Sequence, residues 1–492
     1  MGGEQFDVLI VGAGFGGIGA AIQLKQLGYD NIVIVEREND LGGTWHVNRY
    51  PGLAVDIPST TYCYWFEPNP YWSRLFAPGA EIKRYADHVA DKYDVRRHMR
   101  FNITVESASW DEDAQLWRVA LAGGETLTAR FLITATGVLS QPYTPDIPGI
   151  ADFQGRMMHT TAWDDNYDFA GRRVGLIGTG ATAVQLIPEL AKKAADLTVY
   201  QRTAIHVVGK TDFPIPGVVQ RLFARVPLIQ RAVGRVTDAI YEVSFVYAVL
   251  RYRYFGWLNI AAERLSNLAR FVAIRDKVLR RKLTPEYDFG CKRPTYSNSY
   301  YPTFTKPHVH LQTSGIERIE PDGIVASDGT KTKIDALVLA TGFDLWQGNF
   351  PAIEIIGRNG RNLGKWWRTE GFQAYQGLSI PDFPNYLSLA SPYAFSLLFF
   401  NMLHYQMRHM DRLFGEVRRR NATMFEVTKE ANARFRDRMR KMQHNTLLYR
   451  ANCAGSRSYY FSPSGEAYLR PTSTRKTISE QTRFPLSDYL IA

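Results

Sequence analysis

FDVLIVGAGFGGIGAAIQL, residues 6–24, decides the fold of the N-terminal part of this chain. Its first six residues, Phe6–Val11, form an apolar run typical of a buried parallel strand, and Ile18–Leu27 has the composition of the helix that follows. Between them Gly12, Gly14 and Gly17 stand in the register G-x-G-x-x-G. This order of strand, glycine-rich turn and helix predicts a Rossmann-like α/β unit.

The residues around this turn have the chemistry of a dinucleotide site. Gly12 allows the tight turn, Gly14 lets a pyrophosphate approach the backbone, and Gly17 lets the helix pack on the strand. The next apolar strand, Ile32–Val35, ends in Glu36, nineteen residues past Gly17, where a carboxylate can accept hydrogen bonds from both ribose hydroxyls. The complete order of these elements favours a dinucleotide site over a plain glycine-rich turn.

A second unit of the same kind begins with the strand Arg173–Ile177. GTGATA follows at residues 178–183, with an alanine in place of the third glycine, and a helix continues through Lys192. The next strand, Leu197–Tyr200, ends in Gln201-Arg202-Thr203 without a carboxylate. An acid there would repel a 2′-phosphate and an arginine attracts one, so this turn predicts NADPH rather than NADH. The residues that we assign to this nucleotide are Gly178, Thr179, Gly180, Ala181, Thr182, Gln185, Arg202 and Thr203.

Two dinucleotide units, the first with an acid and the second with an arginine, indicate that one α/β chain binds both FAD and NADPH. Two further strands end in the triplet A-T-G, at Ala135–Gly137 and at Ala340–Gly342. We expect these two turns to return the chain between the two nucleotide domains.

Composition sets the limits within which these motifs are interpreted. A length of 492 residues favours two or three domains, and 45% hydrophobic with 22% charged residues excludes a disordered or fibrous chain. No stretch is apolar enough to predict a membrane span, and the N-terminus lacks a basic leader region. Three separated cysteines, Cys63, Cys291 and Cys453, exclude a disulfide scaffold, a CxxC pair and a Cys-rich zinc site, and favour a reducing cytoplasm.

The positive charge of the chain is concentrated in one segment. The formal net charge is +11, and Phe213–Lys282 holds 13 basic and 4 acidic residues in helix-like sequence. Two interpretations stay open, a helical subdomain with solvated arginines and a helical surface that contacts a membrane. The segment contains no recognisable nucleic-acid-binding module.

FQGRMMHTTAWD, residues 153–164, resembles the fingerprint of type I Baeyer–Villiger monooxygenases and lies between the two glycine-rich turns, where that family has it. The related flavin-containing monooxygenases carry a similar motif without the Trp-Asp ending. The similarity continues in GGTWHVNRYPGLAVDIPSTTYCYWF (42–66), QRT (201–203), LTPEYDFGCKRP (283–294) and DALVLATGFD (335–344). It covers most of residues 6–345 and weakens from about residue 350, where we expect substrate choice to be decided.

The resemblance implies an activity and a catalytic pair. Members of this family transfer hydride from NADPH to FAD, form a C4a-peroxyflavin with O2, and insert one oxygen atom beside a ketone carbonyl to give an ester or lactone. Arg293 occupies the position of a fixed cation beside the peroxide, which suits a side chain that does not lose its proton. Asp56 matches the carboxylate that holds this arginine beside the flavin.

Other positions match the family's cofactor contacts. Lys292 matches a lysine that binds the 2′-phosphate together with Arg202 and Thr203, and Val105 matches a strand residue beside the adenine. The positions expected to contact the flavin or its nucleotide are Thr44, Trp45, Asp56 and Tyr62. His159 and Trp163 are assigned to coupling between the nucleotide domains rather than to proton transfer.

The expected domains follow from these motifs. Residues 1–150 form the first part of the FAD domain, 165–335 the NADPH domain with a helical insertion at 213–282, and 336–492 the second part of the FAD domain with the substrate pocket. The aromatic and Met-rich stretch 391–410 is expected to be core, with part of it open to lining the pocket. His404 and His409 are five residues apart, which is off the spacing of a helix-borne metal pair, so no metal is predicted.

Alternative functions stay open beside ketone oxidation. The same flavin chemistry makes sulfoxides and N-oxides, although Trp163-Asp164 and Lys292-Arg293 favour ketones. A flavin-binding redox sensor or an uncoupled NADPH oxidase would need only the two nucleotide sites. A disulfide reductase is disfavoured because no CxxC exists. The expected partners are a small ketone and O2, the expected location is the cytoplasm, and the oligomeric state stays open.

Overall fold

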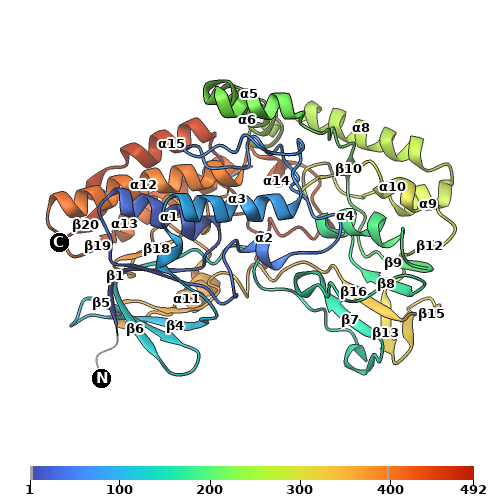
Figure 1. Ribbon diagram of the computed structural model, residues 1–492, viewed down its shortest axis with the longest axis horizontal. Coiled ribbons are helices and arrows are strands. Elements are labelled where there is room, and N and C mark those ends of the chain that lie inside the picture. Colours follow the sequence, from blue (N-terminus) through green and yellow to red (C-terminus); the bar gives the residue numbers. More distant parts are fainter. Residues whose placement is uncertain (1–3, 396–397) are drawn as a thin grey trace.

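Two β-sheets, each containing one of the glycine-rich turns, organise the chain (Figure 1). The computed structural model describes residues 4–395 and 398–492. In the first sheet β1 (Gln5–Val11) lies between β2 (Ile32–Val35) and β6 (Thr126–Thr134), and all three run parallel. The sheet is completed by β3 (Met99–Arg100), β4 (Val105–Asp111), β5 (Leu116–Leu121), β17 (Glu354–Ile356) and β18 (Tyr386–Ser388).

The second sheet is parallel throughout, in the order β12-β9-β8-β16-β7. Its strands are β7 (Arg156–His159), β8 (Arg173–Ile177), β9 (Asp196–Tyr200), β12 (Val309–Gln312) and β16 (Ala336–Leu339). A small antiparallel sheet packs beside it, formed by β13 (Ile316–Glu320), β14 (Gly323–Ala326) and β15 (Lys331–Lys333). Both large sheets are flanked by helices and have separate apolar cores, as the α/β prediction requires.

A helix follows each glycine-rich turn, α1 (Phe15–Gln26) in the first unit and α4 (Ala181–Leu190) in the second. Gly17 explains the close packing of α1, because a Cβ atom built there would lie 2.0 Å from the carbonyl oxygen of Gly12. The predicted strands at 32–35 and 173–177 are confirmed to the residue. The first helix starts three residues before its predicted start at Ile18.

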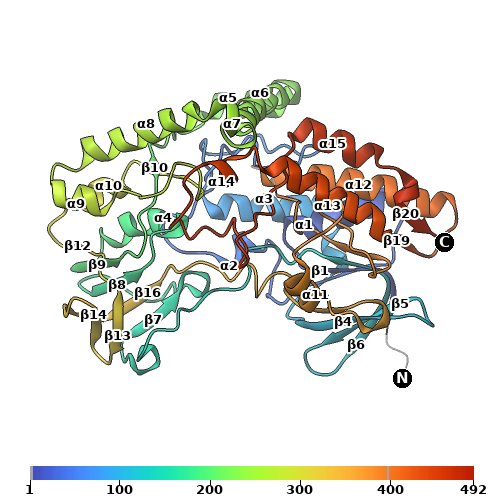
Figure 2. The same ribbon diagram turned by 180° about the vertical axis from the view of Figure 1, so that it is seen from behind.

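Most of the remaining helices form two groups (Figures 1 and 2). Near the first sheet lie α3 (Gly79–Lys92), α11 (Leu363–Glu370), α12 (Phe399–Arg419), α13 (Lys429–Gln443) and α15 (Thr474–Arg483), whereas α14 (Leu447–Arg450) packs beside residues 246–255. Along the opposite edge of the molecule run α5 (Gly217–Arg225), α6 (Pro227–Phe245), α7 (Tyr252–Phe255), α8 (Trp257–Ala273) and α9 (Lys277–Lys282). Within the residues that the structure describes, no helix combines the length and apolar character needed to cross a bilayer.

The strand pairing corrects the domain boundaries that the sequence suggested. β7 precedes residue 165 and β16 follows residue 335, yet both strands pair within the second sheet. The bounds 165–335 are therefore too narrow at both ends. The sequence predicts a strand that ends in the A-T-G triplet of residues 340–342, but it does not indicate that this strand pairs with β8 and β7.

The two segments that follow the A-T-G triplets run beside each other between the sheets. Pro142 and Phe343 form an antiparallel bridge, and the backbone N–H of Tyr143 donates to the carbonyl of Gly342 at 3.0 Å. The chain thus crosses between the two nucleotide units twice at one place.

A disulfide bond joins Cys291 to Cys453, while Cys63 is a free, buried thiol. The sequence predicts no disulfide scaffold, and an odd number of distant cysteines gives no signal for this one pairing. This one disulfide closes a segment of 162 residues and connects two loops, so it does not amount to a disulfide scaffold.

Candidate functional site

A cavity of about 2460 Å³ extends between the two sheets. Pockets for a single small ligand are typically about 300–1000 Å³, so this cavity has room for more than one ligand. Most of the residues singled out from the sequence line it: Gly12, Gly14, Glu36, Thr44, Trp45, Asp56, Tyr62, Val105, Gly178, Thr179, Gly180, Ala181, Thr182, Arg202, Thr203, Lys292 and Arg293.

The N-termini of α1 and α4 both open into this cavity, through Gly14 and Gly180. The first N–H groups of a helix have no partner within the helix, and neither of these helix starts receives a side-chain cap in the described structure. A Cβ atom at Gly180 would meet nothing within 4 Å, so the backbone there is open to a ligand. Free N–H groups and the helix dipole suit a pyrophosphate, so both turns fit a dinucleotide.

Glu36 lies at the end of β2 on the wall of the first half of the cavity. One carboxylate oxygen accepts from the backbone N–H of Ala13 at 2.7 Å, and the other accepts from the N–H of Glu38 at 3.1 Å. These two bonds fix the carboxylate at the edge of the glycine-rich turn. A carboxylate held there has lone pairs left for ribose hydroxyls, as the sequence predicts.

The second half of the cavity carries a group of cations. Burial, and then the nearby charges of Arg202 and Arg457, lower the pKa of Lys292 from its ordinary value. Arg202 is exposed at the end of β9, and Arg457 comes from the distant C-terminal part of the chain. Three mutually repelling cations on one wall suit a doubly charged anion such as a 2′-phosphate.

Trp45 and Tyr62 are in contact on the other wall. The indole Nε1–H donates to the Tyr62 hydroxyl at 2.9 Å, and the ring centroids lie 5.5 Å apart. Trp45 belongs to the short helix α2 (Thr44–Val47), which Figure 1 shows between the two halves of the molecule. Burial raises the pKa of Tyr62 above its ordinary value, so this phenol stays neutral at any physiological pH.

Arg293 and Asp56 form a two-bond ion pair inside the cavity. The guanidinium donates from Nε to one carboxylate oxygen at 2.7 Å and from Nη2 to the other at 2.9 Å. The charge of Asp56 raises the pKa of Arg293 far above its ordinary value. About a third of the arginine side chain (31%) is still open to the cavity, so a fixed cation faces the space where a ligand would lie.

Tyr459 and Tyr460 also lie against this arginine, and no sequence motif indicates them. Burial raises the pKa of both phenols, while the neighbouring Arg293 charge partly opposes that rise. The cavity also includes their neighbours Arg457, Ser458 and Phe461. An aromatic pair in a loop without regular secondary structure has no periodicity that could identify it, and this region lies beyond residue 350, where the recognised motifs end.

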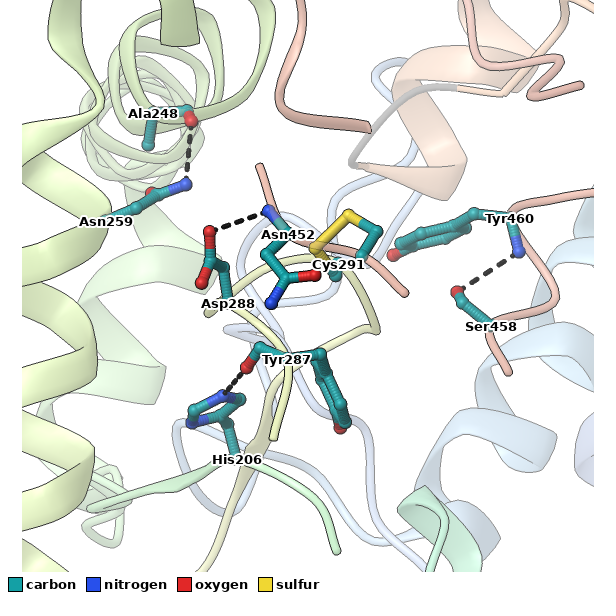
Figure 3. Close-up of a disulfide and its surroundings, with 10 residues drawn as sticks. His206, Ala248, Asn259, Tyr287, Asp288, Cys291, Asn452, Ser458 and Tyr460 are labelled. Carbon is teal, nitrogen blue, oxygen red and sulfur yellow. Dashed lines mark hydrogen bonds between the residues drawn. A yellow bond between two sulfur atoms is a disulfide. The ribbon is translucent and has the colours of Figure 1, made fainter. Parts of the chain in front are cut away.

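The disulfide connects the loop that carries Arg293 to the loop that carries these tyrosines (Figure 3). Cys291 stands two residues before Arg293, and Cys453 lies a few residues before Arg457. Two hydrogen bonds reinforce this connection: the Asp288 backbone N–H donates to the Asn452 carbonyl at 3.0 Å, and the Asn452 backbone N–H donates to the Asp288 side-chain carboxylate at 2.8 Å. The arginine loop and the tyrosine loop are therefore held as one unit.

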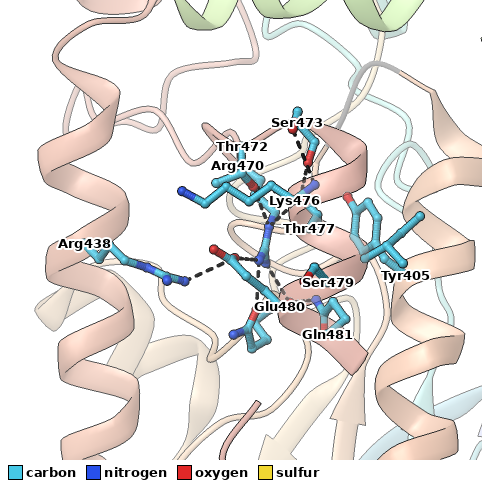
Figure 4. Close-up of polar contacts among 12 residues, drawn as sticks. Tyr405, Arg438, Arg470, Thr472, Ser473, Lys476, Thr477, Ser479, Glu480 and Gln481 are labelled. Atoms are coloured by element: carbon cyan, nitrogen blue, oxygen red, sulfur yellow. Dashed lines mark hydrogen bonds and ion pairs between the residues drawn. The ribbon is translucent and has the colours of Figure 1, made fainter. Parts of the chain in front are cut away.

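Arg470 fixes another part of the cavity wall (Figure 4). It is 1% exposed, and it donates to the Glu480 carboxylate at 2.6 Å and to the Gln376 side-chain oxygen at 2.8 Å. Its backbone N–H donates to the carbonyl of Phe395 at 3.1 Å. Phe395 and the adjacent Leu469 both line the cavity, so the buried ion pair anchors the strand-like segments that form this wall.

Two predicted cofactor residues do not line the large cavity. Gln185 instead uses its amide to hold the loop that precedes Asp56, donating to the Ala54 carbonyl at 2.9 Å and accepting from the Tyr50 hydroxyl at 3.2 Å. The helix turns Gln185 toward that loop, and its contact with a nucleotide stays a prediction. Gly17 is covered by its own turn and contributes close packing.

His159 lies at the crossing between the two units, whereas Trp163 is buried in the core of the second unit. The His159 ring approaches Phe343 at 6.3 Å, and its Nδ1 lies 2.8 Å from the Thr161 hydroxyl. Burial lowers the pKa of His159, which favours the neutral ring. Trp163 stacks on Phe169 with centroids 5.4 Å apart. The position of His159 is compatible with the expected role in domain coupling, which stays a prediction.

The apolar part of the cavity is lined by residues that sequence reasoning did not single out individually. They come from α6, from the start of α12 and from the C-terminal loops: Tyr241, Phe245, Phe395, Phe399, Met402, Leu403, Tyr468 and Leu469. In the stretch 391–410, residues 396 and 397 lie outside the described residues. The rest of it divides into core, such as Tyr405 and Met407, and cavity wall, such as Phe399 and Met402.

Comparison with known proteins gives a consistent result. Residues 9–226 match the family described as pyridine nucleotide-disulphide oxidoreductase. A "Baeyer-Villiger monooxygenase" of Streptomyces coelicolor is 35% identical over 99% of this chain and 93% of its own length. Among solved structures, an "oxidized steroid monooxygenase bound to NADP" superposes with a TM-score of 0.88 at 29% identity and covers 99% of both chains. A complex of OTEMO with FAD and NADP superposes with a TM-score of 0.87 at 28% identity over 99% of both chains.

Proposed function

This chain belongs to the Baeyer–Villiger monooxygenases, which are flavoproteins that use FAD and NADPH, and we propose that Arg293 and Asp56 form its catalytic pair. When bound, the two cofactors supply the redox chemistry, hydride from the nicotinamide and activation of O2 at the flavin. The protein supplies positions, charges and a dry cavity around them. The observation that carries the proposal is the two-bond ion pair of Arg293 and Asp56, which leaves part of the guanidinium facing the cavity.

Arg293 is proposed as the permanent cation of the reaction. Insertion of an oxygen atom beside a ketone carbonyl builds negative charge on oxygen, and a water-poor cavity gives that charge no solvent shell. An arginine remains protonated under all working conditions, and the Asp56 carboxylate strengthens that preference. The guanidinium therefore stabilises charge without exchanging a proton with the substrate.

Asp56 is proposed to orient the arginine. With both guanidinium bonds accepted by one carboxylate, the plane of the guanidinium is fixed relative to the cavity. The loop that carries Asp56 is in turn fixed by Gln185 of α4 through two bonds to Ala54. The arginine geometry thus depends on contact between the first nucleotide unit and the second.

For the nucleotide that donates hydride, we propose that Lys292 and Arg202 bind the 2′-phosphate, with Arg457 as a third cation. The lowered pKa of Lys292 reflects burial beside these like charges, which an anion would relieve. Thr203 supports the turn, because its carbonyl accepts from the Thr179 hydroxyl at 2.7 Å. FAD is proposed to occupy the unit of Gly12, Gly14 and Glu36.

The substrate is proposed to be a hydrophobic ketone that reacts with O2. Tyr241, Phe245, Phe399 and Leu469 present aromatic and aliphatic surface to the cavity near Arg293 and the tyrosine loop. Apolar walls with one fixed cation suit a molecule whose single polar group is its carbonyl. We further propose that the enzyme acts in the cytoplasm, where NADPH is available as the reductant.

The test is a turnover measurement with purified holoenzyme, NADPH and air. Ester or lactone, sulfoxide and hydrogen peroxide are quantified per NADPH consumed, over a panel of ketones and thioethers. We expect ester or lactone from at least one hydrophobic ketone, and its loss in Arg293→Ala. Ester formation that survives in Arg293→Ala would remove this arginine from the reaction.

A further inference from the structure

The helices that form one edge of the molecule carry an unusual amount of exposed apolar surface. Of the 25 large hydrophobic side chains exposed among the described residues, 18 lie between Phe213 and Val278. Single exposed apolar residues are normal, whereas a concentration on neighbouring helices marks an interaction surface. In both views α5, α6 and α8 lie at the outer edge, and no other labelled element covers them (Figures 1 and 2).

Helix α6 is amphipathic, but its apolar side faces outward instead of toward the protein core. Its apolar residues Ile229, Val233, Val236, Ile240 and Val243 recur at helical spacing and form one stripe, and every one of them is exposed. Such a stripe normally faces the core.

The opposite side of α6 is polar and faces the protein. Gln230 is 3% exposed and donates to the Asn69 carbonyl, and Glu242 accepts from the backbone N–H of Thr474 at 2.6 Å. The helix therefore satisfies its polar groups inward and presents its apolar stripe outward.

Helix α8 repeats the inversion. Trp257, Ile260, Leu265, Leu268 and Phe271 are all more than half exposed, the highest of these being Trp257 at 63%.

The buried residues of α8 are all polar, namely Asn259, Ser266 and Arg270. Asn259 donates to the Ala248 carbonyl at 3.0 Å, Ser266 donates to the Val207 carbonyl at 3.0 Å, and Arg270 is 3% exposed. Two long helices, α6 and α8, thus expose their apolar residues and bury polar ones. This arrangement indicates that the medium outside them is itself apolar.

The charge on these helices indicates which medium that is. The segment Phe213–Lys282 holds 13 basic and 4 acidic residues, and Arg231 and Arg235 are exposed on α6 beside the apolar stripe. A second copy of this chain would bring the same excess of arginines against itself. An anionic lipid surface instead complements both properties, since its headgroups pair with arginine and its acyl region accepts the apolar side chains.

We propose that this outer helical face, formed by the exposed apolar residues of α5, α6 and α8 with their flanking arginines, docks onto an anionic lipid bilayer and lies in its interface. The face adjoins the substrate cavity. Tyr241 and Phe245 of α6 line that cavity, and Ile240 belongs both to the cavity lining and to the outer stripe. Docking brings the cavity wall against the lipid, where a hydrophobic ketone is concentrated. The docking goes beyond the proposed catalysis and does not depend on it.

Vesicle flotation of the full-length holoenzyme tests the proposal. Vesicles of phosphatidylcholine alone are compared with vesicles in which about a third of the lipid is phosphatidylglycerol. We expect the protein to float with the anionic vesicles, with affinity that falls as salt is raised. The double variant Val236→Glu with Leu268→Glu should lower the partition coefficient about tenfold or more, because each change places a carboxylate in the face.

Controls separate docking from damage to the fold. Val236 and Leu268 are 61% and 56% exposed and neither lines the cavity, so turnover of a water-soluble ketone should be unchanged in the double variant. Leu490→Glu alters a 57% exposed leucine on the distant strand β20 (Tyr489–Ile491) and should leave flotation intact. Arg231→Gln with Arg235→Gln should remove the preference for anionic lipid while retaining the fold.

A spectroscopic readout locates the contact. Brominated lipids should quench part of the tryptophan emission of the parent protein and less of it in Trp257→Phe, since Trp257 lies at the start of α8 on the proposed face. Three results would overturn the proposal: no flotation with anionic vesicles, flotation indifferent to Val236→Glu with Leu268→Glu, or a homodimer in light scattering that this double variant dissociates. The last result would assign the face to a second copy of the chain.

Discussion

Arg293 donates two hydrogen bonds to Asp56 across the boundary between the two nucleotide units, although 237 residues separate them in sequence. Asp56 stands in a loop of the first unit, and Arg293 stands in a loop of the second. The cation that we propose for catalysis is therefore correctly aimed only when both units are in place.

Removal of the arginine should separate hydride transfer from oxygen insertion. In Arg293→Ala we expect NADPH still to bleach the flavin absorbance, while ester formation falls about 100-fold to 1000-fold because the developing oxyanion loses its fixed partner. Stopped-flow absorbance and product analysis measure the two steps separately. Arg293→Lys is the matched control, since it keeps the charge but loses the two-bond geometry; equal ester yields in all three proteins would contradict the assignment.

Loss of the Asp56 carboxylate should lower the rate of ester formation by changing the orientation of Arg293. Asp56→Asn retains one acceptor oxygen and removes the charge, so we expect ester formation to fall by about 100-fold or less, with more hydrogen peroxide released per NADPH. The measurement is the ratio of peroxide to ester under air. In the Arg293→Ala background the same change should add little, and an additive loss would show that Asp56 acts independently.

The cation group at the second nucleotide should set the choice between NADPH and NADH. Replacing Lys292 or Arg202 by alanine removes one charge-assisted contact and should raise KM for NADPH about 10-fold to 100-fold, with the KM for NADH nearly unchanged. Steady-state kinetics with both nucleotides test this. Lys193→Ala, at an exposed lysine outside the cavity lining, serves as a control for the loss of a positive charge, and an equal rise in KM for both nucleotides would argue against phosphate recognition.

Reduction of the disulfide should loosen the tyrosine loop. The bond closes a segment of 162 residues, and we expect Cys453→Ser to lower the free energy of unfolding by about 2 to 4 kcal/mol. Peroxide release should rise as well, because Tyr459 and Tyr460 would no longer be held against Arg293. Thermal unfolding and peroxide assays provide the readouts, with Cys63→Ser as the control that leaves the bond intact. Thiol counting of the untreated protein checks that the bond is present.

Asp238 on α6 should make stability depend on pH. Burial, and then the nearby charge of Glu242, raise the pKa of Asp238 from 3.8 to about 7, and one of its carboxylate oxygens is buried without a hydrogen-bond partner. Between these two pKa values the folded chain holds a proton that the unfolded chain has released. Stability therefore falls as pH rises from about 4 to about 7 and stays lower above that range.

The corresponding variant is Asp238→Asn, which removes the buried charge. We expect it to raise the free energy of unfolding by about 1 to 3 kcal/mol at pH 8 and to have much less effect at pH 5. Denaturant unfolding at the two pH values measures the difference. A similar stabilisation at both pH values would show that the burial of the charged Asp238 carboxylate does not destabilise the fold.

Sequence reasoning reached the parts of the site that depend on backbone geometry. Gly12, Gly14 and Glu36 are constrained by the shape of a strand-turn-helix unit, so their spacing alone indicates a dinucleotide, and the structure places them on one cavity. The pairing of Arg293 with Asp56 came instead from resemblance to a family. No spacing rule connects two residues so far apart, although the structure places them 2.7 Å from each other.

Other parts of the site carried no readable signal. Tyr459, Tyr460 and Arg457 lie in a loop whose course is set by a disulfide and by contacts to Asp288, which a single sequence does not display. Gln185 occupies a helix beside the glycine-rich turn, and only its rotamer decides that it binds the loop that carries Asp56. The boundaries at 165 and 335 were too narrow because parallel strands are added to a sheet by segments distant in sequence.

The contact between Asp56 and Arg293 also limits how such enzymes can be recombined. A chimera that takes its first nucleotide unit from one relative and its second from another joins an Asp56 loop to a foreign Arg293 loop and to a foreign α4. Both cofactors could still bind to their own units in such a hybrid. Oxygen insertion in the hybrid would depend on whether the Asp56 loop and the Arg293 loop contact each other with the geometry seen here. The two loops and Gln185 should therefore be transferred together, rather than either domain alone.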